Sequence, residues 1–508
     1  MAGRRPGRGG VAVTALGLAP ARPTRLDARG LLGALLDAGS FASWDAPARV
    51  PEGASPEYLA DLERARERSG TDESVLTGEG RIGGNPVAVI ASEFGFLGGS
   101  IGQGAADRIV AAIERAAARG LLLIAAPASG GTRMQEGTPA FLQMVRITRA
   151  LADYKGRRLP YLVFLRHPTT GGVFASWGSL GHVTVAEPGA LIGFLGPKVY
   201  AGLTGRDFPA GVQTAEHLFR HGTVDAVLDV GGFRRLAGDV LSIWGAAPHR
   251  AGSHRTADDG AAPPAAVDRP AAVVGSPSGG AWDSVLRTRD PRRPGLAELL
   301  EAGFGRSVRL HGTGRGGASA STVIVLAELC GRPVVVVGQD RAAQRAGSVL
   351  DAAGLAQARR GIRLAQELGL PLVTVIDTPG AELSDRAEEQ AIAGGIADCV
   401  AALIALRVPS VAVLLGEGTG GGALALAAAR RIVAAEHAWL APLPPEGASV
   451  IVHGDVTRAA ELSASQRIGA RELERAGAVH ELVAEGPGFL ERVALAASRQ
   501  LWAQGECG

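Results

Sequence analysis

The residues best suited to chemistry in this sequence are glycines that lie where an apolar run meets a segment able to form a helix. The stretch 169–176, TTGGVFAS, follows the apolar run 161–165 in this way. Glycine has no Cβ, so a substrate oxygen can approach the backbone N–H groups of such a turn, and the positive end of the helix adds to the attraction. Paired N–H groups stabilise an oxyanion. Gly171 and Gly172 are therefore candidate catalytic residues, although a Gly-Gly pair alone is more often a plain turn.

The same pattern occurs a second time in the C-terminal part of the chain. The apolar run 411–415 leads into 416–425, GEGTGGGALA, which again combines a glycine turn with a helix start rich in small residues. Gly421 and Gly422 form the second candidate catalytic pair. Two copies of one pattern favour a functional origin over a chance turn.

The surroundings of the two pairs also repeat. Gly131 lies 41 positions before Gly172, and Gly380 lies 42 positions before Gly422. Apolar runs at 121–125 and 372–376 precede these upstream glycines, and the segments 186–191 and 435–440 resemble each other further along the chain. Matching order and spacing indicate an internal duplication, so we expect one fold that occurs twice.

The composition agrees with two α/β domains. The 508 residues are 46% hydrophobic but only 4% aromatic, so the core must consist mainly of Ala, Val and Leu. Such a core suits parallel strands that are buried on both faces and alternate with helices. Helices are expected at 26–38, 58–68 and 103–119, with a strand at 86–91.

Charge and cysteine content exclude several classes of protein. The net charge of +2 gives no electrostatic support for nucleic-acid binding. Cys330, Cys399 and Cys507 form no C-x-x-C pair, so neither a disulfide framework nor a metal site is expected, and a reduced cytoplasmic location fits best. The most apolar stretch, 399–415, is interrupted by charge and proline, which argues against a membrane span.

The N-terminal 24 residues allow two interpretations. Two arginines at 4–5 followed by the apolar stretch 11–21 resemble a twin-arginine secretory signal. The stretch is short and contains glycine and proline, so we favour a disordered tail over residues 1–24.

Longer motifs carry a resemblance to a known family. The segments 96–100, 129–137, 169–172 and 187–197 together resemble the beta subunit of bacterial acetyl-CoA carboxylase carboxyltransferase over residues 25–241. From about Arg293 the chain resembles the alpha subunit of the same enzyme. The segments that carry this second resemblance are 376–381, IDTPGA, the acidic pair 388–389, 416–418, 421–425 and 445–449, PEGAS.

The resemblance implies a fold and a domain division. It implies two tandem crotonase-like domains of the ClpP/crotonase superfamily, each built of repeated ββα units. The expected order is a disordered tail at 1–24, a beta-like domain at 25–245, a flexible linker at 246–285 and an alpha-like domain at 286–503. The linker assignment depends on a composition rich in Ala, Gly, Pro, Ser and Arg.

The resemblance also implies a reaction. It implies transfer of a carboxyl group from carboxybiotin to acetyl-CoA, which gives malonyl-CoA for fatty acid biosynthesis. Gly171 and Gly172 would hold the acyl-CoA carbonyl, and Gly421 and Gly422 the ureido oxygen of biotin. Biotin would arrive on a separate biotin carboxyl carrier protein that is loaded by a biotin carboxylase. At least a homodimer is expected, with 173–181 and 423–430 near the contact.

Further residues are assigned to substrate binding. Arg133 and Gln135 either contact CoA or hold their loop in place, and Lys198 is a candidate for a CoA phosphate. His167 can orient a substrate or bond to backbone, Asp377 can act as a base or cap a turn, and Glu417 is similarly ambiguous. The predicted substrate-binding set is Gly98, Gly99, Gly130, Gly131, Arg133, Lys198 and Gly380.

Departures from the family pattern leave other functions open. No cysteine precedes Cys330, so the zinc module of the beta subunit is missing, and the segments after Gln339 and Gly380 look shortened. Lysines expected within 341–363 are replaced, and Pro444 stands where Ser is expected. A decarboxylase of the same fold, acting on malonyl-CoA or a malonyl carrier protein, is one alternative. A non-catalytic scaffold that binds the biotin carrier is another.

Overall fold

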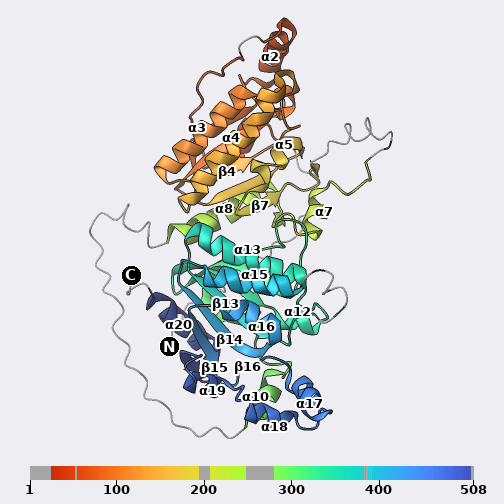
Figure 1. Cartoon of the computed structure of the whole chain (residues 1–508). Coiled ribbons are helices and arrows are strands. Elements are labelled where there is room, and N and C mark those ends of the chain that lie inside the picture. Colours follow the sequence, from red (N-terminus) through yellow and green to blue (C-terminus); the bar gives the residue numbers. More distant parts are fainter. Residues whose placement is uncertain are drawn as a thin grey trace, which may run out of the picture.

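A computed structural model describes residues 25–51, 54–193, 206, 208–246, 280–382, 384, 387, 390 and 392–504. Figure 1 shows two sheets, one above the other, each with helices packed beside it. The N-terminal half, in red to yellow-green, forms the upper part of the view. The C-terminal half, in green to blue, forms the lower part. The described residues thus form two α/β halves, each around its own sheet, as the predicted fold class requires.

The first sheet has seven strands in the order β1-β2-β3-β4-β5-β7-β9. Strands β1 to β3 pair antiparallel, and every later pairing is parallel. All five residues of β4 and of β5 are buried, as expected for a parallel strand covered on both faces. The bounds are β1 Ala42–Ser43, β2 Val75–Ile82, β3 Asn85–Ser92, β4 Leu122–Ala126, β5 Tyr161–Leu165, β7 Val183–Ala186 and β9 Ala226–Val227. Outside this sheet, β6 Thr169–Thr170 pairs with β8 Ile192–Gly193.

The second sheet repeats this order as β10-β11-β12-β13-β14-β15-β17. It also begins with two antiparallel pairings and continues in parallel. The bounds are β10 Phe304–Leu310, β11 Thr322–Leu329, β12 Arg332–Gln339, β13 Leu372–Thr378, β14 Ser410–Thr419, β15 Arg431–Ala435 and β17 Glu481–Val483. The short strand β16 Trp439–Ala441 pairs with the last residues of β14. The shared order confirms the duplication that the glycine spacing predicts.

The helices of the first half follow the predicted ranges closely. Helix α3 begins at Gln103 and ends at Arg119, and its buried face is lined by Ile109, Val110 and Ile113. The helices of this half are α1 Ala28–Leu35, α2 Pro56–Ser69, α3 Gln103–Arg119, α4 Gly137–Gly156, α5 Gly171–Phe174, α7 Ala215–Arg220 and α8 Val230–Gly245, with short 3₁₀ turns η1 Leu97–Gly99, η2 Met134–Glu136 and η3 Trp177–Ser179.

The second half begins earlier than the sequence suggests. Helix α10 covers Ala281–Thr288, so its residues 281–285 lie in the range expected to be linker, and the Thr288 hydroxyl accepts a hydrogen bond from the buried Trp439 indole. An amphipathic helix with a docking partner orders this end of the connection. The other helices are α11 Leu296–Gly303, α12 Arg341–Arg345, α13 Ala352–Leu368, α15 Ile392–Ile404, α16 Gly420–Ala427, α17 Pro445–His453, α18 Ala459–Ser465, α19 Ala470–Arg475 and α20 Phe489–Trp502.

The two halves share one continuous apolar core, whose buried residues come from both sheets. Ion pairs join them as well: Arg360 lies 2.9 Å from Asp225, and Lys155 lies 3.0 Å from Glu367.

Among the helices described, none combines the length and apolar character needed to cross a membrane.

Candidate active site

The first glycine turn lies between β6 and the short helix α5. Gly171 is the first residue of the helix and has a φ of 61°, a backbone conformation that residues other than glycine rarely adopt. The side chain of the preceding Thr170 makes no capping bond to the helix. The first N–H groups of a helix have no partner within it, so this end presents N–H donors.

The upstream glycines pack directly against this turn. A Cβ on Gly131 would lie 3.4 Å from both the Gly171 Cα and the Gly172 nitrogen, and a Cβ on Gly99 would overlap the Ala128 carbonyl oxygen at 2.0 Å. The Gly130 N–H donates to the Gly98 carbonyl at 2.9 Å. The fold thus brings together six of the predicted site glycines, Gly98, Gly99, Gly130, Gly131, Gly171 and Gly172, although their contact with a substrate stays a prediction.

Arg133 lies beneath these loops, and only 1% of it is exposed. Its guanidinium pairs with the Glu73 carboxylate, donates to the Ser100 carbonyl at 2.8 Å and donates to the Tyr58 hydroxyl at 3.3 Å. With its donors used in this way, Arg133 holds the loop in place, which is the second of the two roles the sequence allows. Contact of Arg133 with a substrate stays a prediction. Gln135 is exposed on the neighbouring 3₁₀ turn.

The second glycine turn lies between β14 and α16. Gly420 opens the helix with a φ of 58°, and the preceding Thr419 again makes no capping bond. A Cβ on Gly422 would lie 2.9 Å from the Ala381 nitrogen and 3.0 Å from the Gly380 carbonyl carbon. Gly380, itself at a φ of 130°, therefore lies against this turn, as Gly131 does against the first.

The strand pairings give an exact register for the two halves. Ser129 pairs with Thr169, and Thr378 pairs with Gly418, so each position in the first turn corresponds to one 249 residues later. The structural counterparts of Gly171 and Gly172 are thus Gly420 and Gly421, one residue before the predicted pair. Gly422 occupies the next helical position, whose N–H also lacks a partner within the helix.

Buried charges lie beneath the second turn. Asp377 at the end of β13 is fully buried, and its carboxylate accepts the Glu417 N–H at 3.1 Å and lies 3.3 Å from the Arg341 Nε. Burial raises the pKa of Asp377 to about 6, although the Arg341 charge opposes this. The contact with the Glu417 N–H joins the end of β13 to β14, whereas the turn after Asp377 is closed by the Thr378 hydroxyl, which accepts the Gly380 N–H at 3.1 Å. The role of Asp377 as a base stays a prediction.

Glu417 takes part in a second ion pair. Its carboxylate lies 3.3 Å from the Arg289 Nε, and Arg289 also pairs with Glu446 at 2.6 Å. Burial raises the pKa of Glu417. This network ties α10 to the strand that leads into the second turn. The sequence does not single out Arg289 or Arg341. The carboxylate partners of Arg289 lie more than 100 positions away and that of Arg341 lies 36 positions away, so neither pair leaves a local pattern.

Gln339 is another positioning residue that the turn motif does not reveal. Its side-chain amide donates to the Gly422 carbonyl at 2.6 Å, and its oxygen accepts the Asp377 N–H at 3.2 Å. It therefore fixes the end of β13 to the start of α16. The only hint in the sequence is a polar residue at the end of the apolar strand β12.

The remaining predicted residues have simple structural explanations or fall outside the described part. The His167 Nδ1 accepts the Leu191 N–H at 3.1 Å, which matches the backbone-bonded role, and burial lowers the pKa of His167. Lys198 lies outside the described residues. Within the part of the chain that the structure describes, no group of three or more His, Cys, Asp or Glu side chains is placed to hold a metal ion.

The two turns do not face each other within one chain. Figure 1 shows α5 in the upper half and α16 in the lower half, with the junction between the sheets separating them.

Comparison with known proteins provides independent findings. Residues 32–485 match the family model described as the carboxyl transferase domain. A probable biotin-dependent acyl-coenzyme A carboxylase beta3 subunit of Mycobacterium tuberculosis is 54% identical over 455 residues, which cover 89% of this chain and 88% of the relative. The acetyl-coenzyme A carboxylase carboxyl transferase subunits beta/alpha of Salinispora arenicola are 39% identical over 477 residues, which cover 91% of this chain and 83% of the relative.

Solved structures agree on the fold. The transcarboxylase 12S hexamer, solved with hydrolysed methylmalonyl-coenzyme A, superposes with a TM-score of 0.73 at 21% identity, over 94% of this chain and 89% of that one. A single-chain, multi-domain long-chain acyl-CoA carboxylase superposes with a TM-score of 0.71 over 94% of this chain and 46% of its own length. These likenesses confirm the predicted crotonase-like fold.

Proposed function

This chain belongs to the carboxyl transferase domain family, and we propose that it is the carboxyltransferase component of a biotin-dependent acyl-CoA carboxylase. The observation that carries the proposal is the repeated turn, in which a glycine of positive φ opens an uncapped helix in each half. Carboxyl transfer needs two sites for negative charge, and the chain has two turns suited to it.

The proposed reaction moves a carboxyl group from a ureido nitrogen to the α-carbon of a thioester. Two oxyanions develop, an enolate on the thioester oxygen and a ureido oxyanion as the N–C bond breaks. Backbone N–H donors at the N-terminus of a helix stabilise such charge without rearranging during the reaction. We assign the thioester oxygen to the N–H groups of Gly171 and Gly172, and the ureido oxygen to those of Gly421 and Gly422.

Biotin, bound to a separate carrier protein, would supply the carboxyl group and, after its release, a basic nitrogen that accepts the α-proton. The protein need not provide a side-chain base. This agrees with the role of Asp377, whose carboxylate is used by the Glu417 N–H and Arg341. The chain would contribute orientation of both substrates and exclusion of water.

We further propose that acetyl-CoA is the substrate and malonyl-CoA the product. The Salinispora relative named for acetyl-CoA supports this choice, whereas the more similar Mycobacterium relative is named only for acyl-CoA. Rates measured with acetyl-CoA, propionyl-CoA and longer acyl-CoA in the presence of a carboxylated carrier test it. A rate higher for a longer acyl chain than for acetyl-CoA would overturn the substrate assignment alone.

We also propose a homo-oligomer in which the first turn of one chain faces the second turn of another. The separation of the turns within one chain supports this arrangement. The segments 173–181 and 423–430 follow the two turns directly, and Leu424 in the second segment is 54% exposed. Size-exclusion chromatography with light scattering should show at least a dimer, and a fully active monomer would contradict it.

The general activity can be tested in the reverse direction. Purified protein is mixed with malonyl-CoA and free biotin, and carboxybiotin and free CO2 are both measured. Formation of carboxybiotin supports the transferase. Release of CO2 without carboxybiotin would indicate a decarboxylase. If neither product forms but the protein binds the biotin carrier in a separate binding measurement, the chain is a scaffold.

A further inference from the structure

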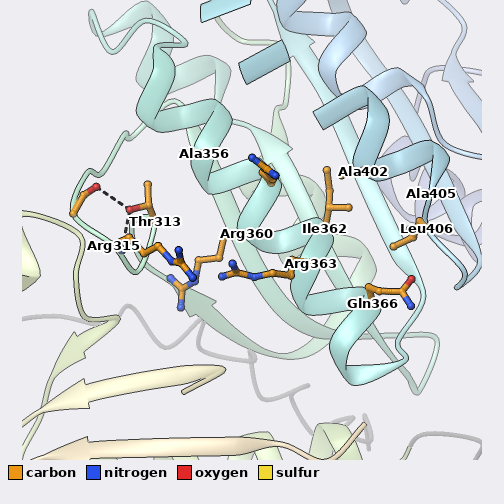
Figure 2. Close-up of a pocket in the computed structure, with 12 residues that line it drawn as sticks. Thr313, Arg315, Ala356, Arg360, Ile362, Arg363, Gln366, Ala402, Ala405 and Leu406 are labelled. Carbon is orange, nitrogen blue, oxygen red and sulfur yellow. Dashed lines mark hydrogen bonds between the residues drawn. The ribbon is translucent and has the colours of Figure 1, made fainter. Parts of the chain in front are cut away.

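A charged cavity lies on the outer side of α13, close to the junction of the two halves. Its volume is about 580 Å³, within the usual range for small-molecule pockets, and it is lined by the loop at 313–316, by α13 and by the end of α15. Figure 2 shows the side chains of Arg315, Arg360 and Arg363 gathered at one end of it. Ile362, Ala402 and Leu406 form an apolar wall at the other end.

The arginines are not fully neutralised by their neighbours. Arg359 pairs with Asp398, and Arg360 pairs with Asp225 and donates to the carbonyls of residues 311 and 312. The nearest carboxylate oxygen to Arg363 lies 3.8 Å away, on Glu367. Burial lowers the pKa of Arg363, and the positive charges of Arg315, Arg360 and Arg359 lower it further.

Arg315 is the most available of these cations. Its side chain is exposed at the tip of the loop and forms no ion pair or hydrogen bond with a residue in the described ranges. A guanidinium with free donors beside two further guanidinium groups favours an anion that accepts several hydrogen bonds, and phosphate fits this geometry best.

A smaller polar cavity of about 150 Å³ adjoins the first and shares Arg315, Arg360 and Arg363 with it. Lys155 and Thr223 of the first half line its opposite side. Its one carboxylate, Glu367, is already paired with Lys155 at 3.0 Å and lies 3.1 Å from the His182 Nε2. The two cavities thus provide a polar end rich in cations and an apolar end.

We propose that these two cavities bind a phosphorylated nucleoside. Its phosphates contact Arg315 and Arg363, and its flat base packs against Ile362, Ala402 and Leu406. A purely inorganic anion would leave the apolar wall unused, and an uncharged base would leave the guanidinium groups without a partner. The proposal does not depend on the proposed carboxyl transfer.

This site is separate from the second glycine turn. Gly354, near the start of α13, packs against Leu350, and Leu350 pairs with Ala381 beside that turn. Arg363 lies nine residues further along the helix, roughly 14 Å at 1.5 Å per residue. Two sources of the ligand share the same chemistry, a free nucleotide and the nucleotide end of an acyl-CoA bound elsewhere.

Isothermal titration of the full-length protein with ADP, pyrophosphate and adenosine tests the proposal. We expect ADP to bind more tightly than either fragment. Replacement of one charge-assisted phosphate contact in Arg315→Ala should weaken ADP binding by about tenfold or more. Arg363→Gln should weaken it similarly. Arg475→Ala, whose side chain is 75% exposed on α19, is the matched control and should bind like the parent.

Titration of ADP in the presence of saturating acyl-CoA separates the two sources. Loss of ADP binding assigns the site to the nucleotide end of acyl-CoA, and unchanged binding assigns it to a free nucleotide. Absence of saturable binding at millimolar ADP would overturn the proposal. Equal ADP binding by the parent and by a folded Arg315→Ala/Arg363→Gln variant would overturn it as well.

Discussion

The segments that lead into the two glycine turns have equal length but different structure. In the first half, residues 161–170 are divided into β5 and β6 by the segment 166–168. In the second half, residues 410–419 form one continuous buried strand, β14. Pro168 stands where the second half has Glu417, and proline offers no N–H to a neighbouring strand. The chain therefore reaches the first glycine turn through an interrupted strand and the second through a continuous one.

The two turns are consequently supported by different interactions. The first is held by backbone contacts between glycine loops, with Ala128 at the position equivalent to Asp377. The second is held by the buried ion pair Asp377–Arg341 and by the partly exposed ion pair Glu417–Arg289. We infer that the first turn is sensitive mainly to added volume, whereas the second is also sensitive to charge and pH.

Blocking either turn should have the largest effect. Gly172→Val and Gly422→Val both place a branched side chain against the N–H donors and their neighbours. Loss of an oxyanion donor lowers kcat by about 10² to 10³-fold, and we expect at least this for each variant in the malonyl-CoA and biotin assay. Variants that fold like the parent and keep their rate would remove both turns from the mechanism.

Removing a buried cation should affect the second half strongly. Arg341→Met leaves Asp377 without its ion pair, which should lower the free energy of unfolding by on the order of 3 kcal/mol in urea denaturation. Arg64→Met, on the exposed face of α2, is the control. If Arg341→Met lowers the free energy of unfolding no more than Arg64→Met does, the ion pair does not support the second turn.

The charge beneath the second turn predicts a pH dependence. Because the pKa of Asp377 is raised from 3.8 to about 6, the folded protein holds a proton that the unfolded chain releases. This residue's contribution to stability is present below pH 4 and is lost as the pH rises through 6. Asp377→Asn should reduce that decline relative to the parent, as measured by unfolding at several pH values. Parallel curves for parent and variant would contradict the assignment.

A smaller substitution should distinguish the turns from each other. A Cβ on Gly172 meets the Thr132 hydroxyl at 3.1 Å and the Met144 side chain at 3.4 Å, both of which can shift. A Cβ on Gly422 meets the backbone of residues 380 and 381 at 2.9–3.0 Å, which cannot shift as easily. We expect Gly172→Ala to keep most of its kcat and Gly422→Ala to lose it. Equal losses would mean that the two turns tolerate volume alike.

Local patterns were sufficient to predict most of the fold. The apolar runs gave β5 and β13 at nearly their observed bounds, and the repeated glycine spacing gave the duplication. The roles of Arg289 and Gln339 could not be predicted, and the sequence could not decide between the two roles of Arg133, because each residue depends on partners that lie far away in the sequence. The finding that Gly421, and not Gly422, is the counterpart of Gly172 also required strand register, since the three consecutive glycines 420–422 fit the spacing in more than one way.

The most direct test of the account is complementation between the two blocked variants. Gly172→Val and Gly422→Val chains are unfolded together, refolded as a mixture and assayed for carboxybiotin formation. If each site combines the first turn of one chain with the second turn of another, random mixing gives about one quarter of the sites with both turns intact, and about a quarter of the parent activity should return. A mixture no more active than the separate variants, with mixed oligomers present, would contradict the claim that two turns from different chains form one site.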